Sequence, residues 1–204
     1  AGTQLVRSAL DGSEPRQLLS LFAGDFALDL LADDKIVLTE KSASGIPSSA
    51  YTLGKDAELV PLARNVPGPT FLSHTNGNAR IIGSDTGSSL SVEIKPSSDA
   101  TSIVLESSTV AEKCAWLPGA SLTAFCAVPE GTPEPGYLTK WHRGVLHTTD
   151  TWYRIDVSAS STEKFFEMST DAAIDVEHPL IDARGEFIAF MSARDKSLWM
   201  LRIM

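Results

Sequence analysis

Short apolar runs recur along this chain, each bounded by turn-forming residues. The clearest kind follows a turn and reads KIVLT (35–39), ARIIGS (79–84), TAFCAV (123–128) and FIAFM (187–191). The first three begin about 44 residues apart. Short apolar runs between Gly, Pro, Asp, Asn and Ser are typical of strands joined by turns. The chain is therefore expected to fold as a repeated all-β unit.

Three further kinds of run complete the repeat. An aromatic or β-branched run follows each of the runs above, another closes three of the units, and a fourth kind precedes the turn. The runs that follow cover residues 49–53, 89–94, 150–157 and 197–203. The closing runs cover residues 59–63, 102–106 and 164–168. The runs that precede the turn cover residues 26–31, 70–74, 113–116 and 177–181. Four strands in about 43 residues match one blade of a β-propeller. Helical periodicity is nearly absent, and Gly24 interrupts its best window, residues 17–34.

The predicted domain is a single β-propeller over residues 1–204, with about five blades. The blade parts cover roughly 1–22, 24–64, 66–107, 110–169 and 172–204. The third complete unit is longer because residues 129–149 form an insertion between its second and third strands. Long structured loops of this kind often carry function.

The two ends of the chain allow more than one blade count. Gln4–Ala9 is expected to be a third strand and Pro15–Leu21 an outermost strand, joined by an Asp11-Gly12 turn. One possibility is that this outermost strand completes the last blade and removes an exposed strand edge. Otherwise the N-terminal hairpin docks outside a four-bladed ring, or it is a separate partial blade; the second alternative gives five blades with one incomplete and is the main expectation. Because Ala1 is not an initiator Met, the chain is expected to be a processed form or part of a larger propeller.

The last unit, HPLIDARGEFIAFMSARDKSLWMLRI, resembles the TolB-type, WD-like propeller repeat. The residues that fall on the repeat pattern are Asp182, Gly185, Ile188, Ala189, Phe190, Ser192, Asp195, Leu198 and Trp199. KCAWLPGASLTAFCAVP (113–129) also resembles a blade of bacterial envelope-associated propellers. The resemblance covers residues 112–204 at the level of motifs and implies the propeller fold. It implies no particular function, because propellers include enzymes, receptors and scaffolds.

The charge of the chain argues against two classes of partner. With 17 basic and 26 acidic residues, the formal net charge is −9 and no basic run breaks the balance. Nucleic acids and anionic membrane surfaces both attract clusters of Lys and Arg. No stretch approaches the roughly 20 apolar residues of a membrane span. We therefore expect no nucleic acid partner and no membrane insertion by this segment.

Cys114 and Cys126 flank the turn LPGASLT and lie equally far from Ala120. In a hairpin centred on Ala120 they face each other directly, at a spacing that a disulfide can meet with small adjustment. The pair therefore predicts a cross-strand disulfide and an oxidising, extracytoplasmic compartment. The alternative is two reduced thiols in the core.

The insertion contains the candidate binding residues Tyr137, Trp141, His142 and Arg143. In propellers the link between second and third strands lies on the usual ligand face, and Trp, Tyr and Arg are enriched in binding hot spots. The alternative is a loop that folds back and buries Trp141 as a local plug.

Evidence for catalysis or for a cofactor is weak in this sequence. His74, His142, His147 and His178 show no metal-binding spacing, although His178 is a candidate for the central channel. Asp25, Asp29, Asp175 and Glu177 are the carboxylates on or near inner strands, with Glu112 near another, while Asp11, Asp150, Asp182 and Asp195 lie at turns or strand starts. Capping of turns explains most of them. No nucleophile elbow, P-loop or dinucleotide fingerprint is present. No cofactor and no metal are expected.

The expected function is therefore a non-catalytic binding or scaffold propeller that recognises a protein or peptide at the cell envelope. The alternatives are a carbohydrate-binding or glycosidase-like propeller, which would use paired carboxylates, and a segment of a larger propeller enzyme or receptor.

Overall fold

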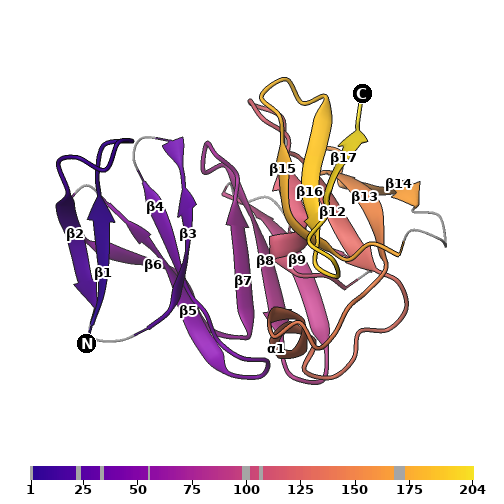
Figure 1. Cartoon of the computed structure of the whole chain (residues 1–204), viewed down its shortest axis with the longest axis horizontal. Coiled ribbons are helices and arrows are strands. Elements are labelled where there is room, and N and C mark those ends of the chain that lie inside the picture. The colour runs from indigo at the N-terminus through magenta and orange to yellow at the C-terminus, as the bar shows by residue number, and fades with distance from the viewer. Residues whose placement is uncertain are drawn as a thin grey trace.

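Five antiparallel sheets follow one another along the chain (Figure 1). The computed structural model describes residues 2–21, 24–32, 35–54, 56–97, 102–105, 108–167 and 173–204. Three sheets have four strands, one has three, and the N-terminal sheet is a two-stranded hairpin. In each four-stranded sheet every strand pairs with the next one along the chain, as in a propeller blade.

The strands are as follows. The hairpin contains β1 (Thr3–Arg7) and β2 (Arg16–Leu21). The first complete sheet contains β3 (Phe26–Leu30), β4 (Ile36–Glu40), β5 (Pro47–Leu53) and β6 (Leu59–Pro67). The second contains β7 (Pro69–Ser73), β8 (Ala79–Asp85), β9 (Leu90–Pro96) and β10 (Ile103–Val104). The third contains β11 (Cys114–Trp116), β12 (Thr123–Pro129), β13 (Asp150–Asp156) and β14 (Ser161–Glu167). The last contains β15 (Val176–Ile181), β16 (Phe187–Ser192) and β17 (Leu198–Arg202).

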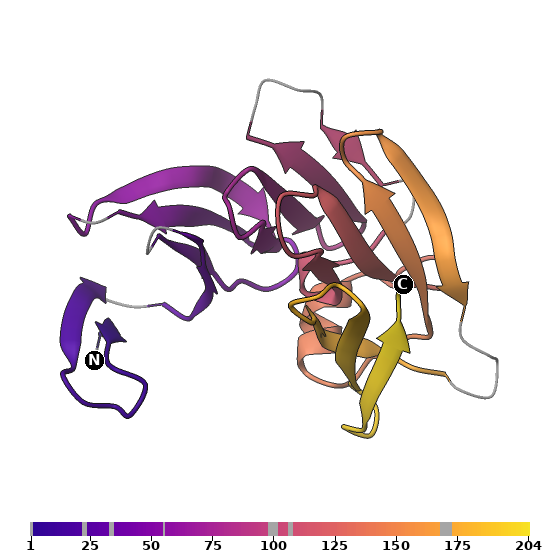
Figure 2. The same cartoon turned by 90° about the horizontal axis from the view of Figure 1, so that it is seen from above.

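The prediction of an all-β propeller is confirmed. Seen from above, the sheets stand side by side in an arc that runs from the N-terminal hairpin to the C-terminal sheet (Figure 2). The three complete sheets and the three-stranded sheet make about four blades. The sequence predicted about five, because it counted the N-terminal hairpin as part of a further blade.

The N-terminal strand does not close the last blade. β2 pairs with β1, from Thr3 opposite Leu21 to Arg7 opposite Arg16, and β17 pairs with β16. The Thr3 hydroxyl also donates to the Gly24 carbonyl just before β3, which keeps the hairpin beside the first complete sheet. The hairpin and the β15–β17 sheet therefore lie at opposite ends of the molecule (Figure 1).

The core lies mainly between the later sheets. Side chains of a strand alternate between its two faces, and in β12 every residue is buried. Cys126 and Val128 face a cluster shared with β8 and β9 of the second sheet. Phe125 and Ala127 face a second cluster, which contains Trp152 and the residues of β16. β12 is thus covered on both faces by neighbouring blades.

Short helices lie before and within the third sheet. The 3-10 helix η2 (Ala111–Lys113) leads into β11, and α1 (Tyr137–His142) lies within the insertion between β12 and β13. Sequence periodicity did not reveal α1, since six residues are too few to establish a period of 3.6. Both helices contribute to the polar site described below.

The predicted disulfide is present. Cys114 and Cys126 are directly opposite each other in the β11–β12 ladder and are covalently joined. Both side chains are buried between the second and third sheets. The bond therefore fixes the innermost strand of the third blade to its neighbour at the centre of the core.

Removing this disulfide should destabilise the fold. For a closed loop of this length, the Cys114→Ala/Cys126→Ala double variant should lose about 3 kcal/mol of unfolding free energy. Urea denaturation would measure the loss, and dithiothreitol should cause a similar loss in the wild type and none in the variant. Alkylation of the unfolded wild type without reductant would contradict the disulfide.

Candidate functional site

The α1 helix is held by polar contacts to the first two complete sheets. The Leu138 amide donates to Asp85 Oδ2 at 2.8 Å. Ser44, in the loop after β4, donates its amide to Thr139 Oγ1 at 2.8 Å, and its hydroxyl accepts the Thr139 amide. The Gly136 amide donates to the Gly87 carbonyl at 2.8 Å. A six-residue helix has little stability alone, so these contacts fix its position.

Asp85 is the centre of this arrangement. It ends β8 and is 1% exposed. Its carboxylate accepts hydrogen bonds from the Ser44 hydroxyl at 2.6 Å and from the amides of Gly87 and Leu138. One buried carboxylate thereby joins the first sheet, the second sheet and the insertion.

The inner side of α1 is apolar and buried. Tyr137, Leu138 and Trp141 pack with Leu90 and Val110, and the rings of Tyr137 and Trp141 are stacked with their centroids 6.5 Å apart. This packing corresponds to the plug interpretation of the insertion. His142 and Arg143, the other two candidate binding residues, are exposed.

A buried ion triad lies beneath α1. Lys113 Nζ lies 2.6 Å from Asp150 Oδ2 and 2.6 Å from Asp175 Oδ1, and all three side chains are fully buried. Its third hydrogen bond goes to Thr148 Oγ1 at 2.8 Å. The three protons of the ammonium group therefore have three acceptors. Lys113 ends η2, Asp150 begins β13 and Asp175 precedes β15, so the triad joins the third and last sheets.

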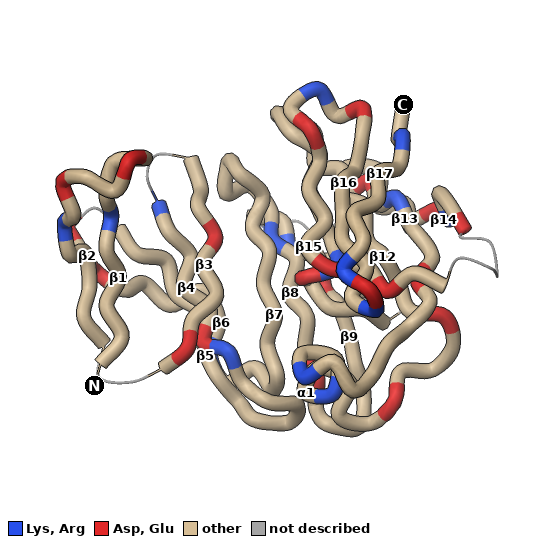
Figure 3. The backbone as a smooth tube through the Cα atoms, in the orientation of Figure 1, with Lys and Arg blue, Asp and Glu red and all other residues tan. Residues whose placement is uncertain are grey.

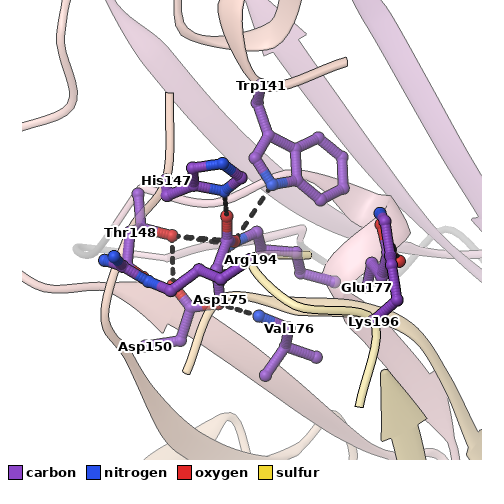
Figure 4. A network of polar contacts seen from close by, with 10 residues as sticks. Trp141, His147, Thr148, Asp150, Asp175, Val176, Glu177, Arg194 and Lys196 are labelled. Carbon is purple, nitrogen blue, oxygen red and sulfur yellow. Dashed lines mark hydrogen bonds and ion pairs between the residues drawn. The ribbon is translucent and has the colours of Figure 1, made fainter. Parts of the chain in front are cut away.

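Side chains of the insertion gather around Asp175 (Figure 4). Trp141 Nε1 donates to Asp175 Oδ1 at 3.0 Å, and its ring lies 5.1 Å from Lys113 Nζ. His147 Nδ1 is 3.2 Å from Asp175 Oδ2, with the His147 side chain 31% exposed. Thr148 Oγ1 also lies 2.7 Å from Asp150 Oδ1. The interior of the site is thus buried, and the site reaches solvent at His147.

The triad shifts the pKa of each of its members. Burial alone would lower the pKa of Lys113, but the charges of Asp150 and Asp175 raise it above its ordinary value. Burial raises the pKa of Asp150 despite the opposing effect of Lys113. Burial would also raise the pKa of Asp175, but Lys113 and hydrogen bonds from Trp141 and His147 lower it instead. The pKa values of the two carboxylates shift in opposite directions because Asp150 is the more deeply buried and Asp175 accepts more hydrogen bonds from the insertion.

Tyr137 adds a buried hydroxyl to this region. Within the described residues, its oxygen has no hydrogen-bond partner. Burial raises the pKa of Tyr137 to about 12. The group therefore stays neutral at physiological pH.

The glycine at position 83 in β8 helps to place Lys113. Gly83 is opposite Thr70 in the β7–β8 ladder, and a Cβ at position 83 would overlap the Thr70 hydroxyl. In that space Thr70 Oγ1 accepts the Ala111 amide at 2.9 Å. Thr70 and Gly83 together fix the start of η2, and η2 directs Lys113 towards the carboxylates.

The other candidate carboxylates are engaged in local contacts. Asp25 forms an exposed ion pair with Lys41, and Glu177 pairs with Lys196 at 2.8 Å. Asp29 accepts the Ser73 amide, and its pKa is raised by burial and by the charge of Glu112. Glu112 itself lies 2.6 Å from His142 Nε2.

The turn carboxylates behave as predicted, with one exception. Asp182 accepts three backbone amides, and Asp11 and Asp195 bind the serines two residues ahead. These hydrogen bonds lower the pKa of all three groups. Asp150 is the exception, because it is an internal member of the ion triad.

Two of the remaining histidines differ in environment. His74 is buried, with its ring edge against Trp116 and its Nδ1 accepting the Asn76 amide. His178 is exposed and has a φ of 51°, in the left-handed region, at a β-bulge in β15. Within the described residues, no group of three or more His, Cys, Asp or Glu side chains could hold a metal ion.

The sequence did not reveal the triad. A lysine inside the otherwise apolar run KCAW was its one local signal, since Lys is almost never fully buried unless it is paired. Its partners could not be identified because Asp175 is 62 residues away in sequence. Asp175 was a candidate for its place on an inner strand, and Asp150 was assigned to a strand start.

Solved structures of low sequence identity share this architecture. The putative TolB of Agrobacterium tumefaciens matches with a TM-score of 0.62 and 14% identity, over 99% of this chain and 67% of its own. TolB of Acinetobacter baumannii matches with a TM-score of 0.59 and 12% identity, over 98% of this chain and 48% of its own. An oligogalacturonate lyase of Vibrio parahaemolyticus matches with a TM-score of 0.62 and 11% identity, over 97% and 53%.

The fold is that of a TolB-type β-propeller. The resemblance seen in the last repeat is thereby confirmed. At these identities the likeness concerns the fold alone, and the chain spans from about half to two thirds of these three proteins. No family model matches the sequence, and no curated protein matches it. Among the described residues, no helix has the length and hydrophobicity to cross a bilayer.

Replacing Lys113 should lower the free energy of unfolding, because Asp150 and Asp175 stay buried without their cation. Lys113→Met leaves two carboxylates buried without their cation and should lose about 3–5 kcal/mol of stability at pH 8. In the wild type the pKa of Asp175 is lowered, so its contribution is present at neutral pH and is lost as the pH falls. In the variant, burial without Lys113 should raise that pKa, so the variant should gain stability as the pH falls.

The difference between wild type and Lys113→Met should therefore be smaller at pH 5 than at pH 8. Urea denaturation at both values would measure it. Lys164→Met, which removes an exposed lysine paired with Glu167, is the matched control and should change stability by less than about 0.5 kcal/mol. A loss that is equal at both pH values would contradict the role of the buried charges.

Replacing Asp85 should release α1. Asp85→Ala leaves three donors without their acceptor and should cost about 3 kcal/mol. Hydrogen exchange at Leu138 and Thr139 should become faster in the variant. Asp182→Ala removes a turn carboxylate at a distant site and should leave exchange in α1 unchanged; unaltered α1 protection in Asp85→Ala would show that Asp85 does not anchor the helix.

Proposed function

We propose that this chain is a non-catalytic binding module that recognises a protein or peptide through the face bearing α1. The observation that carries this proposal is the fixation of α1 by four blades. The Asp85 and Ser44 contacts hold it to the first two sheets, and Trp141 binds Asp175 between the third and last sheets. Groups placed on a rigid support bind with less loss of conformational entropy.

The outer side of this support offers suitable recognition groups. His142 and Arg143 are exposed at the end of α1, and Arg143 provides five N–H donors for carboxylates or carbonyls. Val145 and Ile46, in the segments next to α1 and Ser44, are 68% and 56% exposed. A combination of Arg, His and exposed apolar side chains is typical of protein-binding surfaces.

The state of the internal charged groups favours binding over catalysis. A general base needs a free lone pair and a nucleophile needs an adjacent base. Asp150 and Asp175 both accept hydrogen bonds from Lys113, and all three N–H donors of the Lys113 ammonium group are used within the site. The triad is therefore better suited to holding the plug than to chemistry.

An extracytoplasmic, envelope-associated location fits this proposal. The Cys114–Cys126 disulfide is of the kind that persists in oxidising compartments. Lys and Arg positions are dispersed over the sheets rather than gathered in one stripe (Figure 3), which agrees with a protein partner better than with nucleic acid.

The test is a comparison of variants in envelope extract. The His142→Ala/Arg143→Ala variant should capture its partner with an affinity about thirtyfold lower than the wild type, as expected for two hot-spot side chains. Quantitative pull-down followed by affinity measurement on the enriched protein would show this. Both substitutions are exposed, so the fold should be retained, unlike that of Trp141→Ala.

Arg154→Ala is the matched control, because Arg154 is an exposed arginine on β13 that pairs with Glu163. It should capture the partner as the wild type does. Equal capture by all three proteins, or no captured protein with the wild type, would contradict recognition through the α1 face.

A further inference from the structure

A groove of about 410 Å³ lies between the first and second complete sheets. One wall comes from β4, β5 and β6, through Val37, Thr52, Val60 and Leu62. The other comes from the second sheet, where Ser73 and Arg80 line it. The volume is within the range of small-molecule sites.

The groove lies away from α1. Residues that follow β4 and end β8, Ser44 and Asp85, hold the helix. Residues that precede β4 and begin β8, Lys35 and Arg80, line the groove. The groove therefore lies at the opposite ends of the same strands, and a ligand there would not compete with a partner on the α1 face.

Two cations line the groove beside its apolar wall. Lys35 is exposed and Arg80 is partly buried. Within the described residues, no carboxylate forms an ion pair with either side chain. Asp29 extends from the same face of the sheet as Val37, but its carboxylate accepts the Ser73 amide, and burial raises its pKa.

A third cation lies beside Arg80 on the second sheet, on the same face as the carboxylate of Glu93. Lys95 is directly opposite Arg80 in the β8–β9 ladder. Like charges at opposed positions of two strands destabilise a sheet. In a chain with 26 acidic residues against 17 basic ones, a cluster of cations without described carboxylate partners suits a negative group supplied from outside.

The rim of the groove is fixed before a ligand binds. The Thr75 carbonyl accepts the Ala32 amide at 2.7 Å, which ties the β7–β8 turn to the first sheet. The Asn76 side chain donates to the Gly119 carbonyl at 3.1 Å, and the Ser97 hydroxyl donates to the Gly77 carbonyl. A fixed rim lowers the entropy lost on binding.

We propose that this groove binds a small organic anion with an apolar body, of the class of medium-chain carboxylates. Its acid group meets Arg80 and Lys35, and its hydrocarbon part lies on Val60, Leu62 and Val37. Neither the cations nor the apolar wall is sufficient to bind this ligand. The cations alone are hydrated, and the apolar wall alone does not select for charge.

The test uses sodium octanoate as the probe, with octan-1-ol and sodium acetate as matched compounds that lack the charge or the chain. Calorimetry or amide chemical shifts of the wild type should show saturable octanoate binding. Octanol should bind at least about tenfold more weakly, since a hydrogen bond to a charged group contributes that much. Acetate should also bind at least about tenfold more weakly, because it lacks the hydrocarbon chain that the apolar wall would cover. Octanol binding as tightly as octanoate, or no saturation at millimolar octanoate, would overturn the proposal.

Variants locate the site. Arg80→Gln and Lys35→Gln should each weaken octanoate binding by about tenfold, and Lys164→Gln, which removes an exposed cation from β14, should have no effect. Lys35 is exposed, so its variant remains informative if Arg80→Gln is destabilised. Unchanged octanoate binding in Lys35→Gln and in a folded Arg80→Gln would place the ligand elsewhere.

Two further variants test the charge preference of the groove and its independence from the α1 face. Asp33 and Asp34 precede Lys35 and lie outside the described residues; Asp33→Asn/Asp34→Asn should bind octanoate at least as tightly as the wild type. Weaker binding would contradict an anion site.

His142→Ala/Arg143→Ala should retain octanoate binding, so failure of the α1 face and failure of the groove can be told apart.

Discussion

The ammonium group of Lys113 is the centre of a polar network that joins three parts of the chain. It bonds to Thr148 of the insertion, to Asp150 of β13 and to Asp175 before β15. Removing three charges from water carries a large desolvation cost, which is offset only where the geometry satisfies every donor and acceptor. Two carboxylates around one cation leave a surplus of negative charge, and the donors Trp141 Nε1 and the Val176 amide face that surplus. The triad is therefore complete only when the insertion, the third sheet and the last sheet are all in place.

This dependence divides the molecule into two parts with different packing. Between the second, third and last sheets, buried clusters and the disulfide fill the space on both faces of β12. Between the first and second sheets, the Asp85 network, the turn contact of Ala32 with Thr75 and the Asp29–Ser73 hydrogen bond contribute to holding the two blades, and a groove remains. The same blade repeat thus yields a close-packed interface on one side and a solvent-accessible one on the other. Charged side chains such as Arg80 and Lys35 line the groove, whereas the clusters on the two faces of β12 consist of apolar residues.

The strands and the disulfide could be predicted because their signals are local. A run such as TAFCAV has the apolar character of a strand with both faces covered, and the register of Cys114 with Cys126 follows from the symmetry of one hairpin. The N-terminal closure was wrong because a strand pattern reveals that Arg16–Leu21 is extended, not which edge it pairs with. The triad and the docking of α1 depend on contacts between residues 34 to 95 positions apart, such as Ser44 with Thr139. The hydrophobic periodicity of a sequence contains no information on contacts between such distant residues.

The insertion therefore has two roles that cannot be separated by simple truncation. Trp141 packs on the buried side of α1 and binds Asp175, while its neighbours His142 and Arg143 are exposed and His142 contacts Glu112. The position of the exposed pair depends on the buried ring, because a six-residue helix keeps its orientation only through its contacts. Loss of Trp141 would displace His142 and Arg143 even though the indole itself never meets a partner. Recognition at this face thus depends on the buried ion triad, because the indole of Trp141 links the triad to α1. Substitutions in the triad can therefore alter binding even though they leave the surface residues unchanged.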